Sequence, residues 1–255
     1  MIQLWRLIKH GPGEPAWNMA VDEAMVTVFS RGGVLPTLRL YSWDPPALSL
    51  GYFQKADSVR PEVLERLGIV PVRRVTGGRA VLHYGDLTYS IVAWTGRDIP
   101  EGLLTSYSYL CSGLLQAFTS MGIEAHLGLE KTGRFSPASC FAVATASDIT
   151  WKDRKFVGSA QKRFGTSILQ HGSILIKPQE KLLSEIFTGS SDESKLSEKV
   201  TCMESILGRG VDVDEVSGSL IRGFGKALNI KLVPGELSVE ERELADELAI
   251  KYREM

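Results

Sequence analysis

Three cysteines carry the most reactive side chains in this sequence: Cys111, Cys140 and Cys202. Their odd number and wide spacing argue against a disulfide framework, and none stands in a CxxC pair or near a histidine at metal-ligand spacing. Cys111 and Cys202 are predicted to be core residues, as most single cysteines are. Cys140 lies instead in the polar stretch SPASCF (136–141), where a thiolate could act as a nucleophile.

A second candidate site is the glycine turn 76–79 in the stretch RRVTGGRAVLHYGDLTYS (73–90). The turn matches neither GxGxxG nor GxxxxGK[ST], and a strand rather than a helix follows it. Because a phosphate site of this kind needs the N–H groups of a helix N-terminus, the sequence argues against a P-loop or Rossmann site here. Two interpretations stay open: a tight hairpin turn, or a place where a ligand approaches the backbone closely.

Four basic residues have plain structural interpretations too. Arg73 and Arg74 are adjacent on a predicted strand, so they face opposite sides and at most one can enter a site. His83 is more typical of a hydrogen-bonded structural residue than of a catalyst. Lys155, judged alone, is typical of a solvated strand lysine.

Composition excludes several classes of function. The net charge of −1 shows no electrostatic footprint for nucleic acid. The first eighteen residues are interrupted by Arg6 and Lys9 and lack the apolar core of a signal peptide. No apolar run approaches the length of a membrane span. We therefore expect a cytoplasmic protein that binds neither nucleic acid nor membrane.

Apolar periodicity and turn residues predict an α+β fold, in which a mixed, largely antiparallel sheet is flanked by helices. All 255 residues are expected to form one domain, with 178–255 as its mainly helical tail. The predicted strands are 37–43, 47–53, 69–75, 80–84, 87–94, 123–129, 141–151, 155–164 and 167–176. The predicted helices are 16–31, 59–67, 104–121, 178–187, 198–208, 212–228 and 238–253.

Several motifs in order carry a family resemblance: NMAVDEAM (18–25), LRLYSWDPPALSLGYFQ (38–54), the turn stretch 73–90, KFVGSAQKR (155–163) and QHGSILI (170–176). Together they resemble the lipoate branch of the biotin/lipoate protein ligase superfamily. The resemblance covers residues 15–176 well and the tail more weakly. It implies the catalytic fold of that superfamily.

Two activities compete within this branch. Lipoate–protein ligases use ATP to adenylate lipoate, whereas octanoyltransferases carry octanoate on a cysteine thioester. Cys140 stands fifteen positions before Lys155, and the turn reads GGRAV. Both features resemble the octanoyl-[acyl-carrier-protein]:protein N-octanoyltransferases that use a Cys–Lys pair. The resemblance implies Cys140 as nucleophile and Lys155 as its activating partner and as the group that takes the proton released on amide formation.

The resemblance also implies a slot for the acyl chain under the glycine turn. We expect Lys155 to face this slot together with Val157 and Ser159, its alternate neighbours on the strand. The implied substrate-binding residues are Arg74, Thr76, Gly77, Gly78, Arg79, His83, Gly158, Ser159, Ala160 and His171. No metal and no cofactor are expected; ATP and Mg²⁺ enter only if the protein is a ligase.

The expected partners are octanoyl-acyl carrier protein and a lipoyl-domain acceptor, either the glycine cleavage H protein or a dehydrogenase E2 subunit. Lys162 and Arg163 are candidates for contact with such an acidic carrier, although a solvated face suits them as well. A monomer is expected. Three alternatives remain: an ATP-dependent lipoate ligase, an amidotransferase between lipoyl domains, and a non-catalytic binder of acyl groups or lipoyl domains.

Overall fold

The computed structural model describes residues 2–128, 148–188 and 196–254. An eight-stranded sheet runs through the molecule in the order β11-β1-β2-β6-β10-β9-β8-β7. A smaller sheet has the order β4-β3-β5. The large sheet consists of β1 (Gln3–Gly13), β2 (Thr37–Trp43), β6 (Asp86–Trp94), β7 (His126–Leu127), β8 (Ile149–Trp151), β9 (Arg154–Phe164), β10 (Ser167–Leu175) and β11 (Ile230–Pro234). The small sheet consists of β3 (Ala47–Leu50), β4 (Val70–Arg73) and β5 (Val81–His83).

The predicted fold class is confirmed, because every pair from β2 through β7 in the large sheet is antiparallel. The exceptions are at the other edge, where β1 runs parallel to both β2 and β11. Neither β1 nor β11 was predicted from the sequence. The predicted strand 123–129 is shortened to β7, and residues 141–147 of another predicted strand lie outside the described residues.

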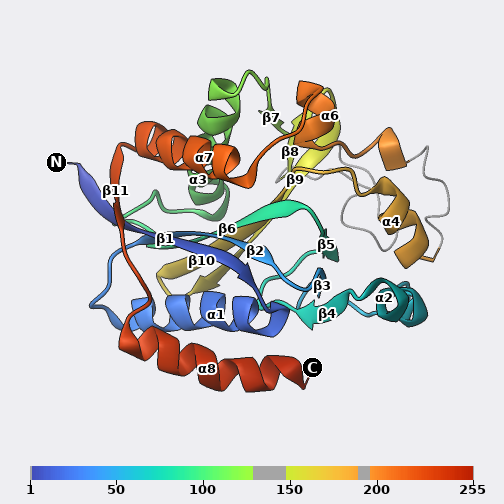
Figure 1. Cartoon of the computed structure of the whole chain (residues 1–255). Coiled ribbons are helices and arrows are strands. Elements are labelled where there is room, and N and C mark those ends of the chain that lie inside the picture. The colour runs from blue at the N-terminus through green and yellow to red at the C-terminus, as the bar shows by residue number, and fades with distance from the viewer. Residues whose placement is uncertain (1, 129–147, 189–195, 255) are drawn as a thin grey trace.

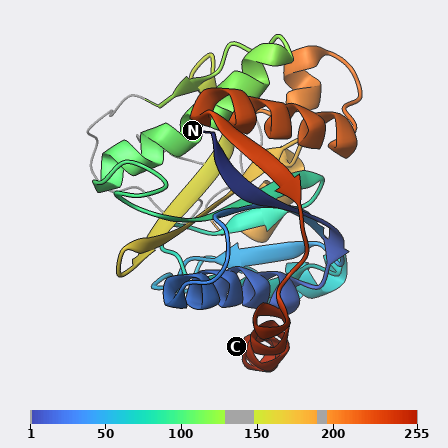
Figure 2. The ribbon, with the colours of Figure 1, turned by 90° about the vertical axis from the view of Figure 1, so that its left-hand side faces the viewer.

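Helices cover both faces of the large sheet, as Figures 1 and 2 show. The helices α1 and α8 lie on one face, and α3 and α7 lie on the other (Figure 1). The helices are α1 (Pro15–Arg31), α2 (Pro61–Leu67), α3 (Leu103–Ser120), α4 (Glu180–Ile186), α6 (Met203–Leu207), α7 (Val213–Leu228) and α8 (Val239–Arg253). The predicted helix 198–208 is therefore limited to the short α6. No helix in the described ranges is long and apolar enough to cross a membrane.

Local sequence explains where the main helices begin and end. Pro15 occupies the first turn of α1, where a missing N–H costs nothing, and Gly32 follows the helix with a φ of 90°. Gly68 ends α2 in the left-handed conformation. Ser238 and Glu241 form a complete capping box at the start of α8.

Alternation along the strands separates the core clusters on the two faces of the large sheet. On β2 and β6, Leu40 and Tyr89 belong to the cluster that contacts α3 and α7, whereas Tyr41 and Val92 belong to the cluster around α1 and α8. This is the period of two that a sheet covered on both faces requires. The α1 face of the sheet also meets the small β4-β3-β5 sheet, and the candidate site lies between them.

Candidate active site

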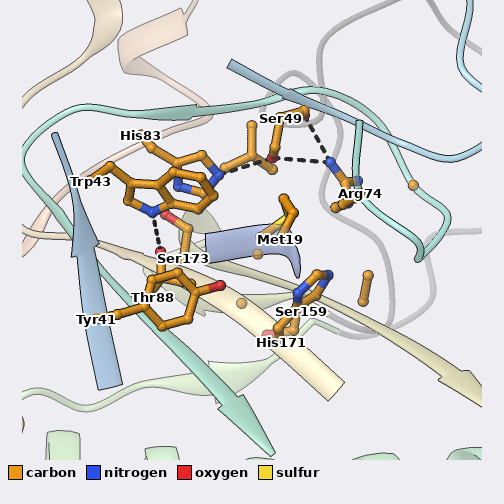
Figure 3. A pocket seen from close by; sticks show the side chains of 15 residues that line it. Met19, Tyr41, Trp43, Ser49, Arg74, His83, Thr88, Ser159, His171 and Ser173 are labelled. Atoms are coloured by element: carbon orange, nitrogen blue, oxygen red, sulfur yellow. Dashed lines mark hydrogen bonds between the residues drawn. The ribbon is translucent and has the colours of Figure 1, made fainter. Parts of the chain in front are cut away.

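A pocket lies between the α1 face of the large sheet and the small sheet that carries the glycine turn (Figure 3). It holds about 430 Å³ of space not filled by atoms, part of it open to solvent. It is lined by Met19, Tyr41, Trp43, Ser49, Arg74, Gly78, Val81, His83, Thr88, Gly158, Ser159, Ala160, His171, Gly172 and Ser173. Most of these side chains are apolar, or are polar groups already hydrogen-bonded to protein, so the pocket suits a largely apolar ligand.

Arg74 holds the glycine turn from inside. Its Nη2 donates to the carbonyl oxygens of Gly77 (2.8 Å) and Arg79 (2.7 Å), while its Nη1 donates to the carbonyl of Ser49 (2.8 Å). Arg73 points the other way and donates to the backbone of the loop after β3. The prediction that these two arginines face opposite sides is confirmed, and Arg74 is the one that lines the pocket.

Asp22 of α1 is a buried carboxylate beneath the pocket. It accepts hydrogen bonds from Arg39 Nη1 (2.8 Å), Tyr41 Oη (2.9 Å) and Ser90 Oγ (2.8 Å). Burial alone would raise the pKa of Asp22, but the hydrogen bond from His171 and the charge of Arg39 outweigh it and hold the pKa below its usual range. Asp22 is therefore ionised and fixes side chains from three strands.

His171 connects Asp22 to the glycine turn. Its Nδ1 lies 3.0 Å from Asp22 Oδ2, and its Nε2 lies 2.6 Å from Thr76 Oγ1. Burial lowers the pKa of His171 more than Asp22 raises it, so the ring is neutral at pH 7. The neutral ring donates from Nδ1 to the carboxylate and accepts from the Thr76 hydroxyl at Nε2. Thr76 thus anchors one side of the turn.

His83 has the same arrangement elsewhere in the pocket. Its Nδ1 lies 2.9 Å from Asp86 Oδ2, and its Nε2 lies 2.9 Å from Ser49 Oγ. The ring stacks on Trp43 with a centroid separation of 4.0 Å. Figure 3 shows His83, Trp43 and Ser49 packed together at one end of the pocket. The hydrogen-bonded setting predicted for His83 is confirmed.

Lys155 is buried rather than solvated, with 1% of its surface exposed. Its Nζ lies 2.7 Å from Asp148 Oδ1. An added Cβ on Gly158 would stand 3.1 Å from the same Nζ, so the ammonium lies against a residue that lines the pocket. A positive charge in this position can stabilise a thiolate or an oxyanion formed at the pocket wall.

The expectation that Lys155 shares a face with Val157 and Ser159 is wrong. Ile149 pairs with Val157, and Thr150 with Lys155, so β9 holds one extra residue at Phe156. Such a β-bulge shifts the alternation of side chains. The side chain of Val157 packs in the core cluster that contacts α3 and α7, whereas the side chain of Lys155 lies against Gly158.

The structure brings most predicted binding residues together around the pocket. The lining includes Arg74, Gly78, His83, Gly158, Ser159, Ala160 and His171, while Thr76 touches it through His171. The hydroxyl of Ser159 accepts a hydrogen bond from Tyr89 Oη at 2.8 Å. Gly77 and Arg79 are part of the turn but are not among the residues that line the pocket. Cys140 lies outside the described residues.

Sequence reasoning missed the acidic residues that hold the basic ones. Asp22, Asp86 and Asp148 are all buried, and each bonds a pocket histidine or Lys155. Asp22 lies in the NMAVDEAM motif, which carries part of the family resemblance and could have marked it as a site residue. Asp86 and Asp148 follow a glycine and a serine in ordinary turn and strand sequence, which does not mark them. Tyr41 and Trp43 are two positions apart on β2, so strand alternation places both on the face of the sheet that meets the pocket.

The other two cysteines are core residues, as predicted. Cys111 and Cys202 are both buried, and burial raises the pKa of the Cys111 thiol to about 12. Within the described ranges, no group of three or more His, Cys, Asp or Glu residues could hold a metal ion.

The whole fold recurs in solved lipoate-protein ligases. A lipoate-protein ligase A solved with bound ATP superposes with a TM-score of 0.83 at 27% identity, covering 98% of this chain and 95% of the other. Residues 14–225 match the lipoyl protein ligase A/B catalytic domain. The chain belongs to this family.

Relatives of nearly equal length are similar over almost the whole chain. The octanoyltransferase LipM of Kyrpidia tusciae is 40% identical over 98% of this chain and 97% of its own length. The octanoyltransferase LipM of Geobacillus kaustophilus is 37% identical over 97% of this chain and 94% of its own length.

Proposed function

We propose that this protein is an octanoyltransferase of lipoate biosynthesis. It takes an octanoyl group from acyl carrier protein onto Cys140 as a thioester and passes it to a specific lysine of a lipoyl domain. The observation that carries the proposal is the Lys155 ammonium, buried against Gly158 at the wall of a largely apolar pocket. The full-length similarity to octanoyltransferases supports it. A cytoplasmic reaction belongs to the same proposal.

The first step exchanges one thioester for another. The Cys140 thiolate attacks the octanoyl carbonyl, and the thiolate of the carrier leaves. Because the bond formed and the bond broken are alike, the step needs no ATP. Only a thiolate is reactive, so a fixed cation near the carbonyl favours the reaction by stabilising sulfur and oxygen anions. Lys155, held by Asp148, supplies that cation.

The pocket supplies binding energy for the alkyl chain. Met19, Val81 and the ring of Trp43 give apolar walls, and Gly158 and Gly172 complete the lining without side chains. An added Cβ on Gly172 would stand 2.4 Å from Ser159 Oγ, so this strand tolerates no side chain there. Burial of each methylene contributes about 0.8 kcal/mol, so a chain of eight carbons is held by several such increments.

Intact-protein mass spectrometry tests the proposal. The purified chain is mixed with octanoyl-acyl carrier protein without ATP, and then an apo-lipoyl domain is added. We expect one octanoyl adduct that disappears as the lipoyl domain gains the same mass. Cys140→Ala should form no adduct, whereas the matched control Cys202→Ala should form it normally. Adduct formation by Cys140→Ala would refute the thioester route.

A lipoate ligase is the second candidate, favoured by the similarity to a ligase that holds ATP. A ligase releases pyrophosphate when lipoate and ATP are supplied and needs no acyl carrier protein. We expect no lipoate-dependent pyrophosphate release from this chain. Release that persists in Cys140→Ala would make the protein a ligase.

A further inference from the structure

We propose that Tyr52, Phe53 and Lys162 form a docking surface, at the mouth of the pocket, for the acidic carrier protein that delivers the acyl group. These three residues are called the rim patch below. The proposal rests on the proposed function and deepens it, because it names the surface that receives the acyl donor.

Two aromatic side chains of the rim patch are exposed to solvent. Phe53 is 89% exposed, the highest value among the exposed large hydrophobic side chains of the described residues, and Tyr52 is 48% exposed. Their rings pack edge to face, with centroids 4.7 Å apart. Single exposed apolar residues are common on protein surfaces, but adjacent exposed aromatic rings are typical of the anchors of protein–protein interfaces.

Lys162 brings a positive charge to these rings. Its Nζ lies 5.0 Å from the ring centroid of Tyr52 and 5.0 Å from that of Phe164. The three chain segments that meet here contain several cationic residues but no aspartate or glutamate. The segments are 51–56, 73–80 and 159–166, and their cationic residues are Lys55, Arg73, Arg74, Arg79, Lys162 and Arg163. A partner with an acidic surface is complementary to this charge.

The rim patch adjoins the pocket along two of its edges. Gly78 and Ala160 line the pocket, and solvent reaches both of them. Gly51 packs directly against the backbone of Gly78, and Tyr52 follows Gly51 in the chain. Lys162 is two positions after Ala160 on β9, so the two side chains share a face of that strand. A protein seated on the rim patch is therefore beside the opening of the pocket.

Arg73 fixes the loop that carries the two aromatic rings. Its Nη1 donates to the carbonyl oxygens of Gly51 and Gln54, each at 2.8 Å. The N–H of Gln54 donates to the Gly51 carbonyl at 2.9 Å, and the N–H of Tyr52 donates to the Thr76 carbonyl at 2.9 Å. A surface that is ordered before binding loses less conformational entropy on association. The loop thus presents the rings in a preformed arrangement.

The structure separates the two cations that the sequence offered for contact with a carrier. Lys162 and Arg163 are adjacent in a part of β9 that pairs regularly with β10, so their side chains point to opposite faces. Lys162 shares its face with Ala160 and contacts Phe164, whereas Arg163 is exposed on the other face. Arg163 therefore serves as a matched control for the charge of Lys162.

Positive charge at the rim favours the acyl donor over the acceptor. The acceptor presents a lysine, which is an ammonium ion in neutral solution, and cations at the mouth of the pocket disfavour its approach. An acidic donor is attracted instead, and complementary charge raises the rate of association. The donor must also pass its acyl chain into the pocket, so the surface of the donor has to come to the rim.

The test measures loading and discharge separately by intact-protein mass spectrometry. Loading is followed at increasing concentrations of octanoyl-acyl carrier protein, and discharge is followed after an apo-lipoyl domain is added to loaded enzyme. We expect Lys162→Glu and Phe53→Ser to lower the second-order rate constant of loading by about 10- to 30-fold, as loss of an interface hot spot does. Their loading rate at saturating donor should approach that of wild type, and their discharge should stay within about threefold of it, because the substitutions leave the pocket intact.

The control and the salt dependence sharpen the test. Arg163→Glu makes the same change of charge on the opposite face of β9 and should load within about threefold of wild type. Raising the salt concentration from about 0.05 M to about 0.3 M should slow loading of wild type, because salt screens the attraction between the partners. The same change should affect loading of Lys162→Glu less.

Three results would overturn the proposal. Loading by both variants at nearly the wild-type rate would show that the donor does not dock on the rim patch. A loss confined to discharge would assign the rim patch to the acceptor instead. Equal losses in discharge and in loading at saturating donor would show that the substitutions disturb the pocket rather than docking. Failure of wild type to form any adduct is a different outcome, since it refutes the proposed function itself.

Discussion

Gly51→Ala should deform the roof of the pocket. A Cβ at Gly51 would stand 1.9 Å from the carbonyl oxygen of Gly78 and 2.8 Å from its carbonyl carbon. Real Cβ contacts essentially never fall below 3.0 Å, so the two backbones must separate by at least 1.1 Å, the difference between 3.0 and 1.9. The backbone bond from Tyr52 N to Thr76 O, at 2.9 Å, opposes that separation. The turn 76–79 therefore shifts or its anchor breaks.

Two magnitudes follow for Gly51→Ala. Overpacking of this kind costs about 1–3 kcal/mol of unfolding free energy. A shift of roughly 1 Å in a group that positions substrate costs on the order of 10²-fold in rate. Urea unfolding measures the first effect, and single-turnover octanoyl transfer measures the second. Gly210→Ala is the matched control, because an added Cβ there meets nothing within 4 Å.

The expected pattern for Gly51→Ala is a modest loss of stability with a much larger loss of transfer rate. Transfer within threefold of wild type would show that the contact between β3 and the turn does not shape the pocket. A loss of stability alone, with normal transfer by the folded fraction, would refute the reasoning in the same way.

Three other predictions concern Arg6, Cys111 and His171. Arg6→Met should lower the free energy of unfolding by about 3–5 kcal/mol in urea titrations, because it leaves the fully buried carboxylate of Glu241 without its ion-pair partner. A loss of less than about 1 kcal/mol would contradict this prediction. Cys111 should resist iodoacetamide in the native protein and react after unfolding, since burial raises its thiol pKa to about 12; peptide mapping checks this, and rapid native labelling would refute it. The free energy of unfolding should fall as the pH drops below about 6.5, because the unfolded state protonates His171 whereas the folded state, in which the pKa of His171 is lowered, does not. His171→Gln should flatten this part of the curve of unfolding free energy against pH. An unchanged slope would contradict this prediction.

Much of the strand and helix pattern follows from the sequence alone. Strands such as β2 and β6 carry regular alternation, and α1 begins at a proline and ends at a glycine, so local signals and tertiary structure agree. The sequence also predicted that a strand rather than a helix follows the glycine turn, because AVLHY (80–84) has a strand pattern. That observation argued against a phosphate loop, whereas the slot under the turn was implied by the family resemblance.

The errors have physical causes. β1 contains His10, Gly11 and Pro12 and lies beside β11, a partner 227 positions later at the Gln3–Ile230 pair. No local signal reveals such a distant parallel pairing. The face of Lys155 was predicted wrongly because a single extra residue in β9 reverses the alternation, and bulges leave no reliable mark in sequence. The buried acids were missed because burial and pairing are properties of the folded chain.

The most direct test of the account is to locate the octanoyl group after the wild-type chain is incubated with octanoyl-acyl carrier protein in the absence of ATP. Proteolysis and mass spectrometry should find it on the peptide that contains Cys140, labile to hydroxylamine as a thioester is. Its transfer to the lysine of an added lipoyl domain should follow. An enzyme that carries no octanoyl group, yet modifies the lipoyl domain once ATP and free octanoate are supplied, would contradict the account.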